Sequence, residues 1–334
     1  MTIKDIAKES GYAVGTVSRV LNNRPGVSEE ARIRVMEVVN KYHFRLNSNA
    51  KHLKQQENSG IAIIVKGRRN MLFSSILEKL NKKIKEIGLS SVIDYISEDD
   101  DEVEEALQLC RERQPIGIIF LGSNKENFRN GFGDIEVPCV MVTNTAEGLD
   151  FDNLSSVSID DKIAAKKAIE YLIELGHKNI GIIGGEMAHS NPARLRYLGC
   201  VEAFEENNLK FDVDKQYTCS YFNLDDGYNA MVELLNKDKS ITAVFAMSDV
   251  TAIGAVRAAK DKGYRVPDDI SVIGFDGIET GQYLVPRLTT ISQPEDMIVE
   301  NSVLTLMNVV NQSEYPEHLV VPFKLLEGES TKRI

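Results

Sequence analysis

Hydrophobic residues follow helical spacing near the start of this chain. They predict two short helices separated by Gly11, a position where a tight turn commonly requires positive φ. The apolar residues of the two inner faces are Ile3, Ile6, Ala7, Val17, Val20 and Leu21. A third helix begins after the capping residue Ser28, and we expect Ile33, Met36, Val39 and Tyr42 to close a small core.

The second helix leaves a set of small or polar residues on or near its outer side. A helix of this kind fits the major groove of B-DNA, where short polar groups and an Arg can reach bases and phosphates. The alternative interpretation is an ordinary helical hairpin that binds nothing, since three-helix cores share much of this spacing. The outward residues are Val14, Gly15, Thr16, Ser18, Arg19 and Asn22.

After residues 55–60 (QQENSG), short apolar runs alternate with amphipathic helices. This order predicts an α/β fold with parallel sheets and right-handed crossovers. The alternation of strands and helices restarts with the run at 180–185, so we expect two such lobes facing each other across a cleft. The strand-like runs are 61–65, 91–96, 117–121, 139–144, 156–159, 180–185, 217–222, 243–247, 271–276 and 319–326.

Charge is distributed unevenly. Residues 1–57 carry ten Lys/Arg and six Asp/Glu, a net charge of +4, whereas the remaining residues carry 29 and 44, a net charge of −15. A mildly basic head on an acidic body favours DNA contact at one end. The chain has neither a long apolar span nor a signal sequence, and its four Cys lack CxxC spacing. We therefore expect a cytoplasmic protein with reduced, mostly buried thiols and no membrane partner.

Motifs typical of enzymes are absent from the sequence, including GxSxG, HExxH and the GxxxxGK[ST] phosphate loop. His177 is interpreted as a residue of a helix end or loop, and the acidic run at 98–105 as a solvated face. We predict no enzyme activity, no cofactor and no metal site.

Polar residues follow several strands of the second lobe, where ligands of parallel α/β sheets bind. Arg196 follows the run at 180–185, Ser248 and Asp249 follow 243–247, and Asp276 ends 271–276. An Arg and an Asp on opposite walls suit the hydroxyls of a sugar. Asp249 is expected to cap a helix instead of contacting the ligand.

Four blocks in the first fifty-odd residues, TIKDIAKESG, TVSRVLNN, VSEEARIRV and FRLNSNAKHL, resemble the headpiece and hinge of the LacI/GalR family of bacterial transcriptional regulators. The resemblance implies a headpiece at 1–46, a hinge at 47–59 and a periplasmic-binding-protein-like core at 60–334. The core's first lobe would comprise about 60–160 plus 291–318, and its second lobe about 161–290 plus 319–334.

The resemblance also implies roles for particular residues. Those assigned to DNA are the outward residues of the second helix with Thr2, Asn47, Ala50 and Leu53. Those assigned to the small effector are Phe73, Asp160, Arg196, Phe222, Ser248 and Asp276. In the loop after the first strand, VKGRRNMLF, the cations Lys66, Arg68 and Arg69 depart from the family's usual residues. They would favour an anionic effector such as a sugar phosphate, or alter the contact between the lobes.

The implied mechanism is a homodimer that places two headpieces on a pseudo-palindromic operator, most often as a repressor. Residues 47–54 would fold as a hinge helix on DNA, with Leu53 inserted into the minor groove. A sugar or sugar phosphate in the cleft would change operator affinity. The alternatives are a cytosolic sugar-binding protein without a DNA role, and a regulator controlled by a protein partner.

Overall fold

The computed structural model describes residues 3–21, 27–41, 60–67, 70–187, 190–312 and 314–334. The chain divides into two compact units, Met1–Glu57 and Asn58–Ile334. Each is described by itself.

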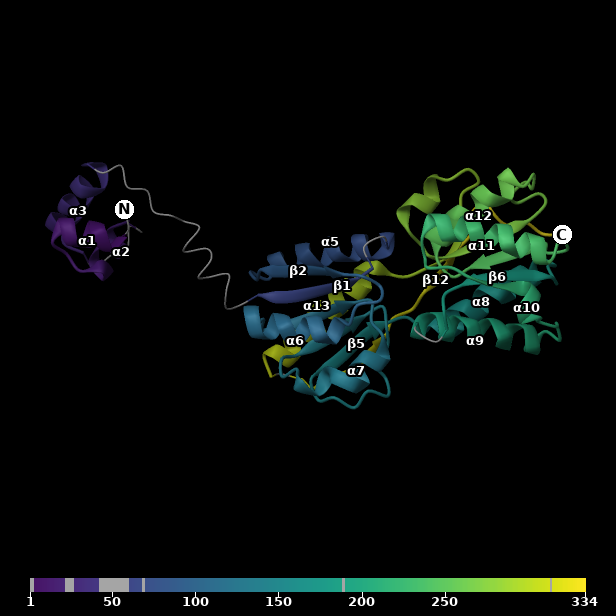
Figure 1. Ribbon diagram of the computed structural model, residues 1–334, viewed down its shortest axis with the longest axis horizontal. Helices are drawn as coiled ribbons and strands as arrows, with labels where there is room; N and C mark the ends of the chain where they lie inside the picture. The colour runs from purple at the N-terminus through teal and green to yellow at the C-terminus, as the bar shows by residue number, and fades with distance from the viewer. Residues whose placement is uncertain (1–2, 22–26, 42–59, 68–69, 188–189, 313) are drawn as a thin grey trace. The chain divides into compact units, whose positions relative to one another are not determined.

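The N-terminal unit contains three helices, α1 (Ile3–Ser10), α2 (Val14–Leu21) and α3 (Glu29–Lys41) (Figure 1). Gly11 has a φ of 78° between α1 and α2, which confirms the predicted turn. Ser28 caps α3 by accepting a hydrogen bond from the backbone N–H of Ala31 at 3.3 Å. The buried core consists of Ile6, Ala7, Val17, Val20, Val35, Val38 and Val39.

The predicted inner face of α3 was partly wrong. Val39 is buried as expected, but Ile33 is 56% exposed and Met36 is 39% exposed. The inward stripe instead runs through Val35, two residues after Ile33, and two residues correspond to roughly half a turn of an α-helix. Tyr42 lies outside the described residues.

The first lobe of the core is a six-stranded sheet in the order β11-β5-β4-β3-β1-β2, with all its strand pairs parallel. Its strands are β1 (Ile61–Lys66), β2 (Ser91–Ile96), β3 (Gly117–Leu121), β4 (Cys139–Val142), β5 (Leu154–Ser158) and β11 (His318–Val320). Its helices are α5 (Met71–Glu86), α6 (Glu102–Arg113), α7 (Lys125–Gly131), η1 (Phe132–Asp134) and α13 (Glu295–Val310).

The second lobe repeats this plan in the order β12-β10-β9-β8-β6-β7, with only the β10–β12 pair antiparallel among the described strands (Figure 1). Its strands are β6 (Ile180–Gly184), β7 (Tyr217–Cys219), β8 (Ala243–Ala246), β9 (Ser271–Asp276), β10 (Thr289–Ser292) and β12 (Lys324–Leu326). Its helices are α8 (Asp161–Glu174), α9 (Asn191–Glu206), α10 (Val213–Gln216), α11 (Leu224–Lys237), α12 (Asp249–Asp261) and η2 (Glu279–Tyr283).

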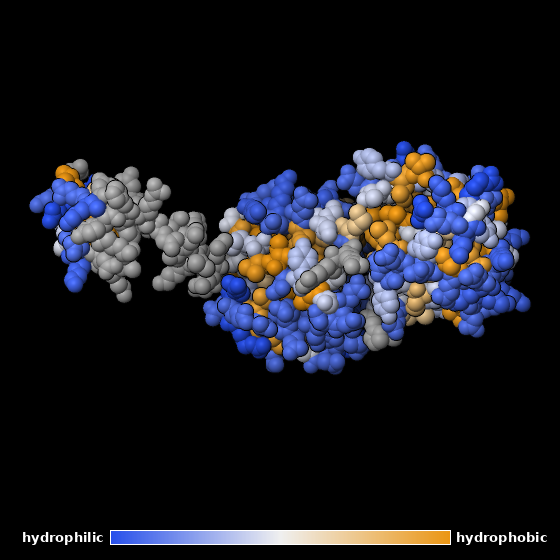
Figure 2. Space-filling view, turned by 45° about the horizontal axis from the view of Figure 1, so that its top comes forward, coloured by the Kyte–Doolittle hydropathy of each residue, from blue (hydrophilic) through white to orange (hydrophobic). Residues whose placement is uncertain are grey.

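Both faces of each sheet are covered by helices, which explains the continuous apolar runs. In β1, Ile61 and Ile63 pack in the cluster that contains residues of α5 and α13, whereas Ala62 and Ile64 pack in the cluster of α6 and α7. In the second lobe, α8 and α9 cover one face and α11 and α12 the other. Hydrophilic residues cover most of the outer face of the core in Figure 2.

The polypeptide chain crosses between the two lobes three times. The chain leaves the first lobe after β5, returns between β10 and α13, and leaves again between β11 and β12. The predicted strand at 319–326 is therefore two strands in different sheets. The sequence patterns also did not identify β10, α7 and α13.

The structure also tests the interpretations of His177 and of the four cysteines. His177 is buried, with Nδ1 2.9 Å from Thr242 Oγ1 and Nε2 3.1 Å from the carbonyl oxygen of Lys332, so it joins chain segments, as its interpretation as a loop residue allowed. All four cysteines are free thiols. Cys139 and Cys200 are buried, whereas Cys110 is half-buried and Cys219 is exposed. Burial, which was predicted for most of the four thiols, is therefore found for two of them.

Candidate functional site

A cavity of about 510 Å³ lies where the carboxyl ends of the two sheets face each other. The first lobe lines it with polar side chains and Phe73, and the second lobe with Arg196, Asp276 and two aromatic residues. The uncharged polar residues of the first lobe are Asn70, Ser123, Asn124, Asn127, Thr143 and Asn144, and its charged residues are Lys66, Glu98 and Asp99. Cavities of this size hold small organic ligands.

Five of the six residues predicted to bind an effector line this cavity: Phe73, Arg196, Phe222, Ser248 and Asp276. The sixth, Asp160, does not line it. Its carboxylate accepts a hydrogen bond from the backbone N–H of Ile163 at 2.9 Å and caps α8.

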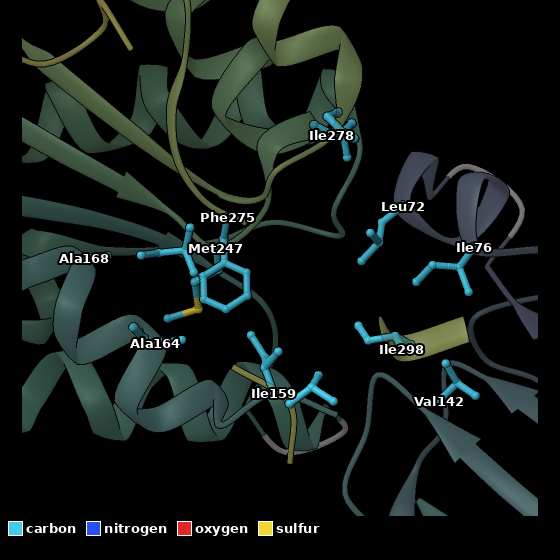
Figure 3. Close-up of a cluster of buried hydrophobic side chains, with 14 of the residues drawn as sticks. Leu72, Ile76, Val142, Ile159, Ala164, Ala168, Met247, Phe275, Ile278 and Ile298 are labelled. Atoms are coloured by element: carbon cyan, nitrogen blue, oxygen red, sulfur yellow. The ribbon is translucent and has the colours of Figure 1, made fainter. Parts of the chain in front are cut away.

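Arg196 is held in the second-lobe wall by three contacts. Its Nε donates to Asp161 Oδ1 at 2.7 Å, and its Nη1 donates to the carbonyl oxygen of Met247 at 2.5 Å. The guanidinium carbon lies 3.6 Å from the centroid of the Phe275 ring. Met247 and Phe275 lie next to each other in Figure 3. These contacts fix the orientation of a buried cation at the cavity.

Asp276 supplies a buried carboxyl group at the end of β9. Its Oδ1 accepts a hydrogen bond from Gln293 Nε2 at 2.9 Å. Burial raises the pKa of Asp276 to about 7, although the nearby Arg196 charge opposes this shift. The group can therefore change its protonation near neutral pH.

The helix-capping role expected for Asp249 belongs to Ser248, which also lines the cavity. Ser248 is the N-cap of α12, and its Oγ accepts a hydrogen bond from the backbone N–H of Thr251 at 3.2 Å. Asp249 is fully buried, and its Oδ2 accepts hydrogen bonds from the backbone N–H groups of Gly277 and Ile278 at 2.7 and 2.8 Å. Asp249 thus holds the loop after Asp276 in place, a long-range role that helix-start signals do not reveal.

Several buried side-chain oxygens at the cavity, of which the two amide oxygens can only accept hydrogen bonds, have no partner among the described residues. They are Ser123 Oγ, Asn144 Oδ1 and Gln293 Oε1. Asn144 is oriented by its Nδ2, which donates to the carbonyl oxygen of Ser123 at 2.7 Å. Because an unpaired buried polar atom is costly, these atoms favour a ligand that donates hydrogen bonds.

Three lining residues other than glycine have positive φ: Thr143 at 67°, Phe222 at 52° and Asp276 at 117°. Backbone strain of this kind gathers at functional sites. A Cβ on Gly185 would lie 2.7 Å from the ring of Phe222, so the absence of a side chain there makes room for the ring.

Lys66 does not provide a free positive charge. Its Nζ lies 2.7 Å from Glu102 Oε2, and the Glu102 side chain is fully buried. Glu102 also accepts hydrogen bonds from the backbone N–H of Asn124 at 2.5 Å and from Asn127 Nδ2 at 2.9 Å. The prediction that the acidic run is a solvated face is therefore wrong for Glu102, which organises the first-lobe wall. Arg68 and Arg69 lie outside the described residues.

The sequence interpretation missed most of the first-lobe wall. Ser123 and Asn124 follow β3, and Thr143 and Asn144 follow β4, so the rule used for the second lobe would have found them. Gln293 follows β10, which the sequence patterns did not identify, and Tyr221 follows β7 but lies inside the longer strand predicted at 217–222. Gln293 lies where the chain crosses back to the first lobe.

The residues predicted to contact DNA are only partly described. In α2, Arg19 is exposed and Thr16 is half-buried, whereas Val17 and Val20 point into the core. Val14, Gly15 and Ser18 belong to α2, but their side chains are outside the description. Thr2, Asn22, Asn47, Ala50 and Leu53 lie outside the described residues.

Comparison with solved structures shows that the fold has known counterparts. The structure of a CelR–cellobiose complex matches with a TM-score of 0.73 and 24% identity, covering 99% of both chains. A Lac repressor structure with bound ONPG matches with a TM-score of 0.79 and 23% identity, again over 99% of both chains. Across the described helices, no segment is long and apolar enough to cross a membrane.

Sequence comparisons identify the family. Residues 2–47 match the model of bacterial regulatory proteins of the lacI family, and residues 169–331 match the periplasmic-binding-protein-like domain. The HTH-type transcriptional regulator MalR of Clostridium butyricum is 36% identical over 99% of both chains. The HTH-type transcriptional repressor PurR of Yersinia pestis is 30% identical over 98% of this chain and 96% of its own. This chain therefore belongs to the lacI family of bacterial transcriptional regulators.

Proposed function

We propose that a neutral sugar bound between the two lobes controls the affinity of this regulator for its operator. The observation that carries the proposal is the set of buried acceptor atoms without protein partners, Asn144 Oδ1 and Gln293 Oε1, next to the Asp276 carboxyl group. Sugar hydroxyls are hydrogen-bond donors that suit such acceptors. Phe73 and Phe222 offer apolar faces against which the C–H groups of a sugar ring can pack.

The charge of the cavity favours a neutral sugar over a sugar phosphate. Its two described cations are already paired, Lys66 with Glu102 and Arg196 with Asp161. Asp276 adds a carboxyl group to the same wall. A phosphate group would have to compete with buried carboxylates for these cations, which costs free energy.

Relatives support this assignment. One matched structure is a complex of CelR with cellobiose, and another is a LacI family regulator from Enterococcus faecium with bound ribose. We propose that this chain likewise acts without catalysing a reaction, and that it works in the cytoplasm, where its DNA target lies.

We propose residues 1–46 as the headpiece, 47–59 as the hinge and 60–334 as the core of a homodimer. Two headpieces would then read the halves of a pseudo-palindromic operator through the outward side of α2. Leu53 would insert into the minor groove at the centre. A ligand that binds one arrangement of the lobes more tightly shifts the population competent for operator binding.

A dye-based thermal melting scan tests the ligand assignment, since the chain contains no Trp. Neutral sugars, sugar phosphates and nucleobases are compared on the wild type, on Asp276→Asn and on a control, Asp225→Asn, whose residue is exposed at the start of α11. A ligand at ~100 times its Kd adds ~2.7 kcal/mol, so a neutral sugar should raise the midpoint by a few degrees.

The shift should persist in Asp225→Asn and be strongly reduced in Asp276→Asn. A preference for sugar phosphates, or a shift that Asp276→Asn leaves intact, would contradict the proposal. A sugar that gives this pattern of midpoint shifts is then added to an operator-binding assay, in which the operator has been selected from random DNA duplexes. Unchanged operator affinity would refute its role as an effector.

A further inference from the structure

A second cavity, of about 490 Å³, lies on the rim between the two lobes. It shares no charged lining residue with the first cavity. Helix α7 of the first lobe contributes Lys125 and Arg129. The beginning of α9 in the second lobe contributes Arg194. Lys125 and Arg129 are four residues apart, so they share one face of α7.

These three cations share the cavity with two carboxylates, those of Glu126 and Glu147, so its described lining carries one excess positive charge. Lys125 Nζ donates to the main-chain carbonyl oxygen of Glu147 at 2.6 Å, and Arg194 Nη2 lies 3.5 Å from Asn191 Oδ1. Within the described part of the chain, neither Lys125 nor Arg194 has a carboxylate within ion-pair distance. Arg129 pairs with the exposed Glu126 on its own helix.

The cations also repel one another. Burial and the charges of Arg129 and Arg194 together lower the pKa of Lys125, although the Glu147 carboxylate opposes this shift. Holding like charges together at a partly buried place is unfavourable unless an anion compensates them. The arrangement therefore indicates that a negatively charged group belongs between the two walls.

We propose that this rim cavity binds a phosphate-type oxyanion between Lys125 and Arg129 of the first lobe and Arg194 of the second. Tetrahedral oxyanions accept several charge-assisted hydrogen bonds, and guanidinium groups match their geometry. Because the cations come from both lobes, the bound anion stabilises the arrangement of the lobes in which the two walls are close. The proposal does not depend on which ligand the first cavity binds.

Isothermal titration of the full chain with inorganic phosphate and with pyrophosphate, at low ionic strength, tests this site. We expect saturable binding that weakens as NaCl is added, since screening reduces the attraction. Arg194→Gln and Lys125→Gln should each weaken binding about tenfold, the effect of one lost charge-assisted contact. The matched control is Lys260→Gln, which removes an exposed cation of α12 and should leave binding unchanged.

A gain of affinity provides a second, opposite readout. Glu147 is exposed and lines the rim cavity, so Glu147→Gln removes a negative charge that opposes the anion and should tighten binding. A simple loss of folding cannot produce tighter binding. Absence of binding to the wild type, or equal affinities for Arg194→Gln and Lys260→Gln, would overturn the proposal. Tighter binding of pyrophosphate than of phosphate would support a diphosphate group that spans both walls, and equal binding a single tetrahedral group.

Discussion

The buried carboxyl group of Asp276 links the stability of this protein to pH near neutrality. Its pKa is raised by burial from an ordinary value of 3.8 to about 7. Between these values the folded chain holds a proton that the unfolded chain has released. Unfolding is therefore increasingly favoured as pH rises from about 4 to about 7, and the stabilisation is lost above pH 7.

We predict that the melting midpoint of the wild type falls more between pH 5 and pH 8 than that of Asp276→Asn. The amide of Asn keeps an acceptor for Gln293 but cannot ionise. Thermal melting of both proteins across this pH range measures the difference. Identical pH profiles would show that Asp276 does not titrate in this range.

Neighbouring acids show how far residue roles can be predicted from the sequence. Resemblance assigned Asp160 to the site, yet Asp161 is the residue that pairs with Arg196. Asp160 is the cap of α8 and Asp161 is its first residue, so one position along the chain changes the direction of the side chain. Arg196 and Asp276 could be predicted because Arg196 comes after β6 and Asp276 ends β9, a rule that depends on topology and not on side-chain direction.

At the scale of elements, the contact between helices α8 and α9 depends on Gly199. A Cβ at this position would lie 2.0 Å from the carbonyl oxygen of Lys162, a main-chain atom that cannot move by itself. We predict that Gly199→Ala lowers the free energy of unfolding by about 1–3 kcal/mol, the usual cost of overpacking. Urea denaturation should show a lower midpoint with an unchanged slope.

The control for this prediction is Gly133→Ala in η1, where a Cβ would have no atom within 4 Å and the φ is not positive. Similar losses for the two variants would mean that helix packing is not the cause.

Helix and strand types were predictable where apolar residues repeat over many positions, as in β1, β3 and α6. The inner face of α3 was not, because apolar residues occur on both its sides, as exposed Ile33 and buried Val35 show. The division of 319–326 into β11 and β12 was missed although Pro322, which lies between them, is a signal against one continuous strand. The pairing itself could not be predicted, because each piece pairs with a strand distant in sequence.

At the scale of the molecule, the separation into two units predicts separable activities. A chain that begins at Asn58 lacks α1–α3 and the segment with a net charge of +4, and its own net charge is −15. We expect it to lose binding to duplex DNA and to keep the response to the sugar. Fluorescence anisotropy with labelled duplex at several salt concentrations measures the DNA binding, and thermal melting scans measure the response to the sugar. Comparable DNA affinities for the short and full chains would contradict this assignment.

Because the chain crosses between the lobes, the two lobes cannot be completed in the order in which they begin to be synthesised. Strand β11 pairs with β5, but it is made only after twelve further described strands and helices that belong mainly to the second lobe. Until β11 emerges from the ribosome, the edge of β5 lacks its partner strand and can pair with another chain. The first lobe, although translated first, is thus completed late, and a stalled or truncated chain would carry an open sheet edge prone to aggregation.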